Sequence, residues 1–304
     1  MRSWFLLFAC NLMWALQFTC IKLVEDQVGP LVTVWAPMFF ATLLLVPFVL
    51  SEPATPPEKR RPLVSDLLLY GALIVMGVFP GQMLMTWGTR LSLASNAALL
   101  SLALPIATAF MAFLFLHERM TRIRWLSFAM AICGVALCSG RDLRGLDLSS
   151  ANFLGNLLIF AGVLGSAFYN SYGKKALNRH SPLRMMFYTY VGMLVLMLPF
   201  VIVEERDVIS RVPHFTMRTW IGLCLLTVFH NFLSMVLFLK ALKALDAIQA
   251  ALSNYLIPAF GVLIATLWLG ERLPLSAIMG GALVFASTLV ITIWEDLRRN
   301  PTIT

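Results

Sequence analysis

Long apolar stretches alternate with short polar segments along the whole chain. Most of the apolar stretches hold about twenty residues, the length that an α-helix needs to cross roughly 30 Å of hydrocarbon. The pattern predicts an all-α integral membrane protein with ten transmembrane helices, which has the lipid bilayer as its surroundings. The expected spans are 3–24, 31–50, 66–88, 93–116, 124–140, 152–173, 185–203, 217–239, 247–270 and 276–294.

The amino-acid composition also favours a lipid environment. Of 304 residues, 60% are hydrophobic and 12% are charged, whereas about a quarter of the residues of a soluble domain are charged. The first apolar segment has an alternative interpretation as a cleavable secretory signal, because Arg2 gives it a basic start and Ala9 and Ala15 are small. Its apolar run is long for such a signal, so we expect a membrane span.

The net charge of +8 raises the question of an acidic partner. No basic stripe with interleaved aromatic residues stands on a soluble element, so nucleic acid is not an expected partner. The cysteines have neither metal-ligand nor CxxC spacing, and we expect no metal and no cofactor. All of them fall within apolar spans as small packing residues: Cys10, Cys20, Cys133, Cys138 and Cys224.

The distribution of positive charge predicts the orientation. If the N-terminus is cytoplasmic and there are ten spans, fifteen of the 23 lysines and arginines lie in cytoplasmic segments and eight lie in external segments. Cytoplasmic segments of membrane proteins carry the excess of lysine and arginine. Both termini are therefore expected in the cytoplasm, as an even number of spans requires.

Two apolar stretches far apart in the chain share one motif. Pro105 stands thirteen residues before Glu118, and Pro258 stands thirteen residues before Glu271. A shift of 152 or 153 residues extends the match through both halves. It places segment 14–22 on 167–175, 30–48 on 182–200, and 94–99 on 247–252.

The match divides the chain into a first five-span repeat (1–140), a linker (141–151) and a second five-span repeat (152–304). Because five is odd, the second copy must enter the membrane from the opposite side. Inverted repeats are the architecture of alternating-access carriers, which bind substrate near the bilayer midplane between the repeats. We therefore expect two inverted five-helix repeats around a central cavity. The alternative is a duplication kept only as a stable bundle.

The chain resembles the EamA-type carriers of the drug/metabolite transporter superfamily. The resemblance rests on Trp14 and Lys22 as W-x7-K, on the mid-span prolines followed by LHER or LGER, and on the small residues of the fifth and tenth spans. It implies a multi-pass transporter of the cell inner membrane that exports amino acids or other small metabolites. Many members carry an arginine midway along the second span, where this chain reads WAPMFFA (35–41), so no anionic-substrate site is carried over.

Amide side chains within or at the ends of the spans are the candidate substrate ligands. An unpaired amide in hydrocarbon costs several kcal/mol, so each must contact protein, water or substrate. Aromatic residues accompany them along the helices, as a pocket for neutral, zwitterionic or amphipathic molecules requires. The alternative for each amide is a hydrogen bond between helices. The candidate substrate ligands include His230 besides these two groups. The amides are Gln17, Gln82, Asn96, Asn170, Asn231, Gln249 and Asn254, and the aromatic residues are Trp14, Phe79, Tyr169 and Tyr255.

Acidic residues stand only at span ends or in loops. Glu118 and Glu271 each close a span beside an arginine, which favours a structural pairing. His230 is the only centrally placed histidine, and it is either a hydrogen-bonding packing group or a proton-exchange site. Pro105 and Pro258 either let the ends of their helices swing or form static kinks.

No nucleophile and base constellation or phosphate-binding loop indicates an enzyme. The sequence thus predicts a secondary transporter of a small-molecule substrate, working by facilitated diffusion or exchange, because no carboxylate lies near the midplane. A polar-lined channel and a flippase of a lipid-linked metabolite are the alternatives. The oligomeric state is not predicted.

Overall fold

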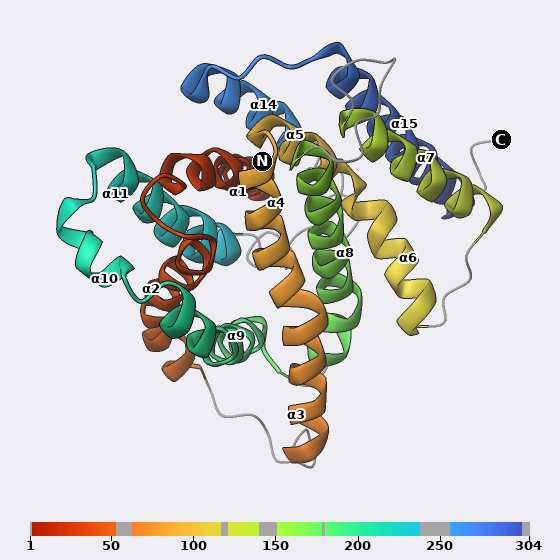
Figure 1. The fold of residues 1–304 in the computed structure, drawn as a ribbon. Helices are drawn as coiled ribbons and strands as arrows, with labels where there is room; N and C mark the ends of the chain where they lie inside the picture. Colours follow the sequence, from red (N-terminus) through yellow and green to blue (C-terminus); the bar gives the residue numbers. More distant parts are fainter. Residues whose placement is uncertain are drawn as a thin grey trace.

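The computed structural model describes residues 2–52, 63–116, 121–139, 151–177, 180–237 and 256–299. Within these ranges the chain is built from helices joined by short turns, and no strand is present (Figure 1). The predicted all-helical architecture is therefore confirmed. Six helical stretches in the described residues are long and apolar enough to cross a membrane: Pro30–Leu50, Val64–Leu91, Ala94–Phe115, Ala151–Leu177, Pro182–Glu204 and Met217–Leu237.

Among the described residues, the first half of the chain contains five helical stretches, at the positions of the first five expected spans. Two of them change helix type along their length. The elements are α1 (Arg2–Val24); α2 (Pro30–Leu50); α3 (Leu63–Ala72) continued by the π-helices η2 (Leu73–Val78) and η3 (Pro80–Leu84) and by α4 (Met85–Leu91); α5 (Ala94–Leu100) continued by the 3₁₀ turn η4 (Ser101–Ala103) and α6 (Leu104–Leu116); and α7 (Arg122–Ser139).

The second half follows the same order. A third π-helix, η6, continues α11, at the place where η2 and η3 continue α3. The elements are α8 (Ala151–Leu177); α9 (Pro182–Glu204); the short α10 (Val208–Arg211) and η5 (Val212–His214); α11 (Met217–Cys224) with η6 (Leu225–Leu233); α14 (Leu256–Leu269); and α15 (Leu275–Arg299). The first part of the expected span 247–270 lies outside the described residues, so the number ten remains a prediction.

Local sequence explains several helix boundaries. Pro30 and Pro182 each stand at the first position of a helix, where a missing N–H leaves no hydrogen bond unmade. Gly270, which follows α14, has φ of 68°, a conformation that glycine adopts without steric cost. Pro105 follows the 3₁₀ turn η4, inside the continuous helical stretch Ala94–Phe115, and Pro258 lies in α14.

Helices α2 and α9 pack against each other along their length. Their buried side chains form one core. Each of the four α2 residues in this core has an equivalent core residue in α9, 152 residues later in the chain. The indole N–H of Trp35 also donates to the carbonyl of Leu194 at 3.1 Å. The pairs are Val34 and Met186, Met38 and Tyr190, Ala41 and Met193, and Leu45 and Met197.

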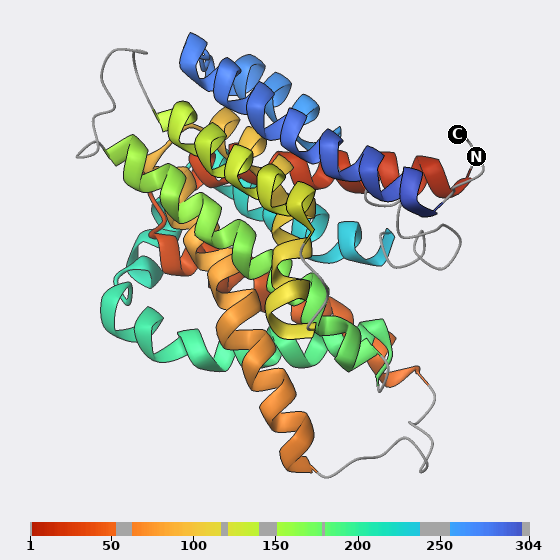
Figure 2. The same ribbon diagram turned by 90° about the vertical axis from the view of Figure 1, so that its right-hand side faces the viewer.

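Glycines bring α4 close to α8. A Cβ atom on Gly155 would lie 2.8 Å from the carbonyl oxygen of Gly88, and one on Gly162 would lie 2.9 Å from the Met85 nitrogen. A larger residue at either position would push the helices apart, so α4 and α8 form a closely fitted pair. Helices α7 and α15 pack side by side at the edge of the bundle (Figure 2).

Candidate functional site

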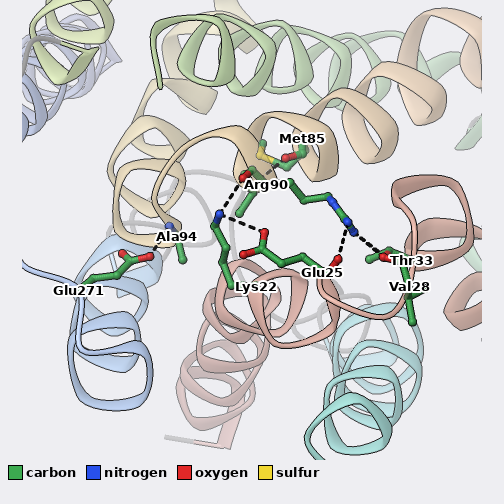
Figure 3. A network of polar contacts seen from close by, with 9 residues as sticks. Lys22, Glu25, Val28, Thr33, Met85, Arg90, Ala94 and Glu271 are labelled. Atoms are coloured by element: carbon green, nitrogen blue, oxygen red, sulfur yellow. Dashed lines mark hydrogen bonds and ion pairs between the residues drawn. The ribbon is translucent and has the colours of Figure 1, made fainter. Parts of the chain in front are cut away.

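Helix ends from both halves of the chain meet in one network of polar contacts (Figure 3). The Lys22 ammonium donates to the carbonyl of Arg90 at 2.7 Å and lies 3.1 Å from the Glu25 carboxylate. The Arg90 guanidinium in turn donates to the carbonyls of Val28 and Glu25, both at 2.7 Å. The last carbonyls of a helix lack partners within it and attract cations. Lys22 and Arg90 therefore join the ends of α1 and α4.

The Glu271 carboxylate caps the start of α5. It accepts the backbone N–H groups of Ala94 and Ser95, both at 2.9 Å, and the Ser95 hydroxyl at 2.6 Å. No side chain next to α5 caps this N-terminus, so the cap comes from the other half of the chain. The sequence suggested a structural pairing for Glu271 beside Arg272, whereas the carboxylate lies on a helix N-terminus. Glu118 lies outside the described residues.

A second carboxylate serves α2 in the same way. Glu205 accepts the N–H groups of Leu31 and Val32, both at 2.9 Å. Gly29 precedes them, and a Cβ atom there would overlap the Glu205 carboxylate. The position therefore requires glycine for as long as the cap is in place.

The residue 153 positions before Glu205 is Glu52, which lies at the far end of α2. The Glu52 carboxylate accepts the Ser181 hydroxyl at the start of α9 and lies 3.5 Å from the Arg184 guanidinium. Helices α2 and α9 are thus tethered at both ends. Sequence reasoning missed Glu52 and Glu205, although the repeat spacing relates them.

Asn96 is buried and contributes to helix packing. Its amide donates to the Ser92 hydroxyl at 3.2 Å, and Ser92 donates to the Asn156 side-chain oxygen on α8 at 2.6 Å. Ser92 and Asn156 are buried polar residues that the sequence analysis did not select. Asn96 therefore joins a hydrogen-bonded chain between helices.

Two of the predicted ligands lie on the π-helix η6. The Asn231 amide donates to the Leu226 carbonyl at 2.8 Å, and the Tyr190 hydroxyl donates to the Asn231 carbonyl at 3.1 Å. His230 is 9% exposed. Its Nδ1 and the Asn231 Oδ1 have no hydrogen-bond partner among the described residues. The side-chain oxygen of Asn96 is likewise unpartnered among the described residues, and buried polar atoms of this kind normally have a hydrogen-bond partner.

The predicted aromatic residues divide between two places. Phe79 and Tyr169 pack against the α2–α9 core, and the Tyr169 hydroxyl lies 3.4 Å from that of Thr189. Trp14 packs against a different core, which includes Ile106 and Ile159. The sequence did not foresee this separation, because neighbours on one helix do not reveal which other helix they face.

The remaining candidates have different environments. Gln17 and Gln82 are half-buried, and Asn170 is exposed. Gln249, Asn254 and Tyr255 lie outside the described residues. In the part of the chain that the structure describes, no cluster of three or more His, Cys, Asp or Glu residues has the arrangement of a metal site.

Comparison with known proteins identifies transporters. The EamA-like transporter family matches residues 1–140 and 153–293. A probable terminal-alkyne amino-acid exporter of Streptantibioticus cattleyicolor is 27% identical over 278 residues, which cover 91% of this chain and 89% of the relative. An S-adenosylmethionine uptake transporter of Rickettsia conorii is 25% identical over 265 residues, covering 86% and 82% of the two chains.

A solved crystal structure shares the fold, with a TM-score of 0.62 over 96% of both chains at 14% identity. At this identity the likeness extends to the fold alone. The family, in contrast, matches nearly the whole sequence and agrees with the apolar helices of the structure. The chain is a multi-pass membrane protein that belongs to the EamA-like transporter family.

Proposed function

We propose that this chain is a secondary transporter of the cell inner membrane, which exports amino acids or similar small neutral, zwitterionic or amphipathic metabolites. Ten transmembrane helices in two inverted repeats (1–140 and 152–304, joined by 141–151) surround a central cavity that opens alternately to each side. Both termini lie in the cytoplasm. Substrate moves by facilitated diffusion or exchange.

One observation carries the inverted repeat. The α2–α9 core contains equivalent positions of the two halves, 152 residues apart in the chain, and the carboxylates at its two ends, Glu205 and Glu52, stand 153 residues apart. A twofold axis between two antiparallel helices produces this arrangement, in which the residue after each helix contacts the start of the other helix. Such an axis in the membrane plane is typical of carriers with alternating access.

The substrate class is supported by the chemistry of the candidate residues. Unpaired polar atoms of His230 and Asn231, together with the aromatic rings of Phe79 and Tyr169, offer hydrogen bonds and an apolar surface without a fixed charge. Gln17 of α1 and Asn170 of α8 complete the proposed lining, and Trp14, which packs against the other core, is the aromatic residue proposed beside Gln17. The relatives carry an amino acid and S-adenosylmethionine, in opposite directions by their names. They support a small metabolite as substrate and leave the direction to experiment.

The test is counterflow in proteoliposomes. Vesicles with purified protein are loaded with one unlabelled compound of a panel of amino acids, S-adenosylmethionine and amphipathic drugs, and uptake of the labelled compound is measured. Saturable uptake that internal substrate accelerates is expected of a carrier. A channel gives non-saturating flux without acceleration, and a flippase moves only lipid-linked compounds, so either result contradicts the proposal.

A further inference from the structure

We propose that the half-helices α3 and α11 are the two gates of the transport path, each hinged on a π-helix and held shut by a side-chain latch. The proposal rests on the proposed function, because a gate requires a transport path. It is carried by two sets of side-chain contacts, one at each end of α2, and by the π-helices that follow both half-helices.

The first latch joins the turn after α1 to the start of α11. The Gln27 side-chain oxygen accepts the Thr219 hydroxyl at 2.6 Å and the Thr216 N–H at 2.8 Å. The Gln27 amide donates to the His214 carbonyl at 3.1 Å. These bonds hold the start of α11 against α1.

The second latch joins the segment after α8 to the start of α3. The His180 Nε2 lies 3.3 Å from the Asp66 carboxylate. Adding 153 to Gln27 gives His180, and adding 153 to Asp66 gives Thr219. The two latches thus occupy equivalent positions in the two halves, at opposite ends of α2.

Each latched half-helix is followed by a π-helix. Helix α3 continues into η2 and η3, and α11 continues into η6. π-Helices are rare and short, and they occur at places where a helix bends or functions. Glycine contacts fix α4 against α8, and Gly77 and Gly81 bring η2 and η3 equally close to α8. A bend where α3 meets η2 would therefore move α3 and leave α4 in place.

Helices α2 and α9 form the frame against which the gates move. The twofold relation between the two halves places α2 on α9 and α9 on α2, so it leaves this pair unchanged. The same relation places the Gln27 latch on the His180 latch. Alternating access is an exchange of this kind. The contact of Glu52 with Ser181 should therefore persist while the two latches open in turn.

The two latches differ in chemistry. Gln27 and Thr219 form an uncharged hydrogen bond, whereas Asp66 and His180 are ionisable. Among the described residues, His180 lies beside Tyr70 of α3, with ring centroids 5.5 Å apart, and Tyr188 of α9, at 5.9 Å, besides Asp66 and the nearby pair of Glu52 and Arg184. In the proposed orientation the ionisable latch faces the cytoplasm, so neutralising Asp66 should loosen that gate alone.

The first test is cross-linking in a chain whose five native cysteines are replaced by alanine. The latch variants are Gln27→Cys with Thr219→Cys, and Asp66→Cys with His180→Cys. The matched control is Glu52→Cys with Ser181→Cys, across the α2–α9 frame. Flux is measured before oxidation, after oxidation and after reduction, with a short thiol cross-linker where no disulfide forms.

Closing either latch covalently should reduce flux by about tenfold, reversibly, because the gate motion is part of every cycle. The control should keep most of its flux. Complete cross-linking of a latch without loss of flux would overturn the proposal for that gate. Absence of flux before oxidation, and in the native chain, would instead contradict the proposed function.

A second test needs no substrate. Cys20 is buried against α11, and Ala176 is buried against α3. In chains that keep only the probed cysteine, because native Cys133 and Cys224 are exposed, Thr219→Val should increase labelling of Cys20 by an impermeant maleimide several-fold. Asp66→Asn should do the same for Ala176→Cys from the opposite side, and Glu52→Gln should change neither. Unchanged labelling in both latch variants would refute the gates even if no transported compound had been found.

Discussion

Glu205 and Val32 stand 173 residues apart in the chain, yet the Glu205 carboxylate accepts the Val32 backbone N–H at 2.9 Å. The same carboxylate accepts the N–H of Leu31. Helix α2 has no side-chain cap of its own at Gly29, so a residue of the other half satisfies its first amides. The contact ties the two halves of the chain together at one end of the α2–α9 pair.

Replacing Glu205 should destabilise the protein. Glu205→Ala leaves two backbone amides without their partner, and the loss of a helix cap costs about 1–2 kcal/mol. Thermal unfolding in detergent should show a lower midpoint for this variant. Glu204→Ala is the matched control, because Glu204 immediately precedes Glu205 and its side chain is exposed. Equal midpoints for the two variants would contradict the capping role.

Gly29→Ala should have a similar effect by a different route. The new Cβ atom would overlap the Glu205 carboxylate and displace it from the start of α2. Gly71→Ala is the control, since a Cβ atom there meets nothing within 4 Å. Because Gly29 and Glu205 act on one contact, the double variant Gly29→Ala, Glu205→Ala should be more stable than the sum of the single effects predicts. Additive losses would show that the two residues act separately.

Gln17→Ala and Asn170→Ala should each impair transport while folded protein stays at normal abundance. Gln17 is half-buried and Asn170 is exposed, so the loss of either side chain leaves no fully buried cavity. Asn96→Ala should behave in the opposite way, with less folded protein, because it breaks the bond to Ser92 between buried groups. Flux per folded molecule and the yield of monodisperse protein separate the two effects. Reduced yield of the Gln17 and Asn170 variants with unchanged specific flux would indicate packing roles for them instead.

His230→Gln should retain substantial flux, because uncoupled transport needs no titratable group and glutamine keeps a hydrogen-bonding side chain. An imposed pH gradient should not concentrate substrate in proteoliposomes. The uncoupled mechanism is wrong if a pH gradient drives accumulation, and if His230→Gln abolishes that accumulation while sparing exchange. His230 would then carry the proton.

The proposed orientation makes a labelling prediction. Arg211→Cys should react with an impermeant external thiol reagent in intact cells, whereas Arg60→Cys should react only after the membrane is permeabilised. The reason is the excess of positive charge on the cytoplasmic side. The reverse pattern would invert the topology and exchange the sides assigned to the two gates.

The sequence by itself determined the helical architecture. A span is recognised from the apolar content of about twenty consecutive residues, and a helix start from a local feature such as Pro30 or Pro182. Both signals lie within one turn or one span of the residue concerned. The relation between the halves was also visible, because the motif at Pro105 and Glu118 returns at Pro258 and Glu271.

Only the tertiary structure decided which helix ends meet. Glu205 is a loop carboxylate by position, and it becomes a cap because the antiparallel packing of α9 brings it to the first amides of α2. Trp14 and Tyr169 face different cores for the same reason. The π-helices also escaped prediction, since their altered hydrogen bonding is stabilised by contacts such as that of Tyr190 with Asn231. Hydropathy is a sum over neighbours in the chain, whereas a hydrogen bond between segments depends on how the helices pack in three dimensions.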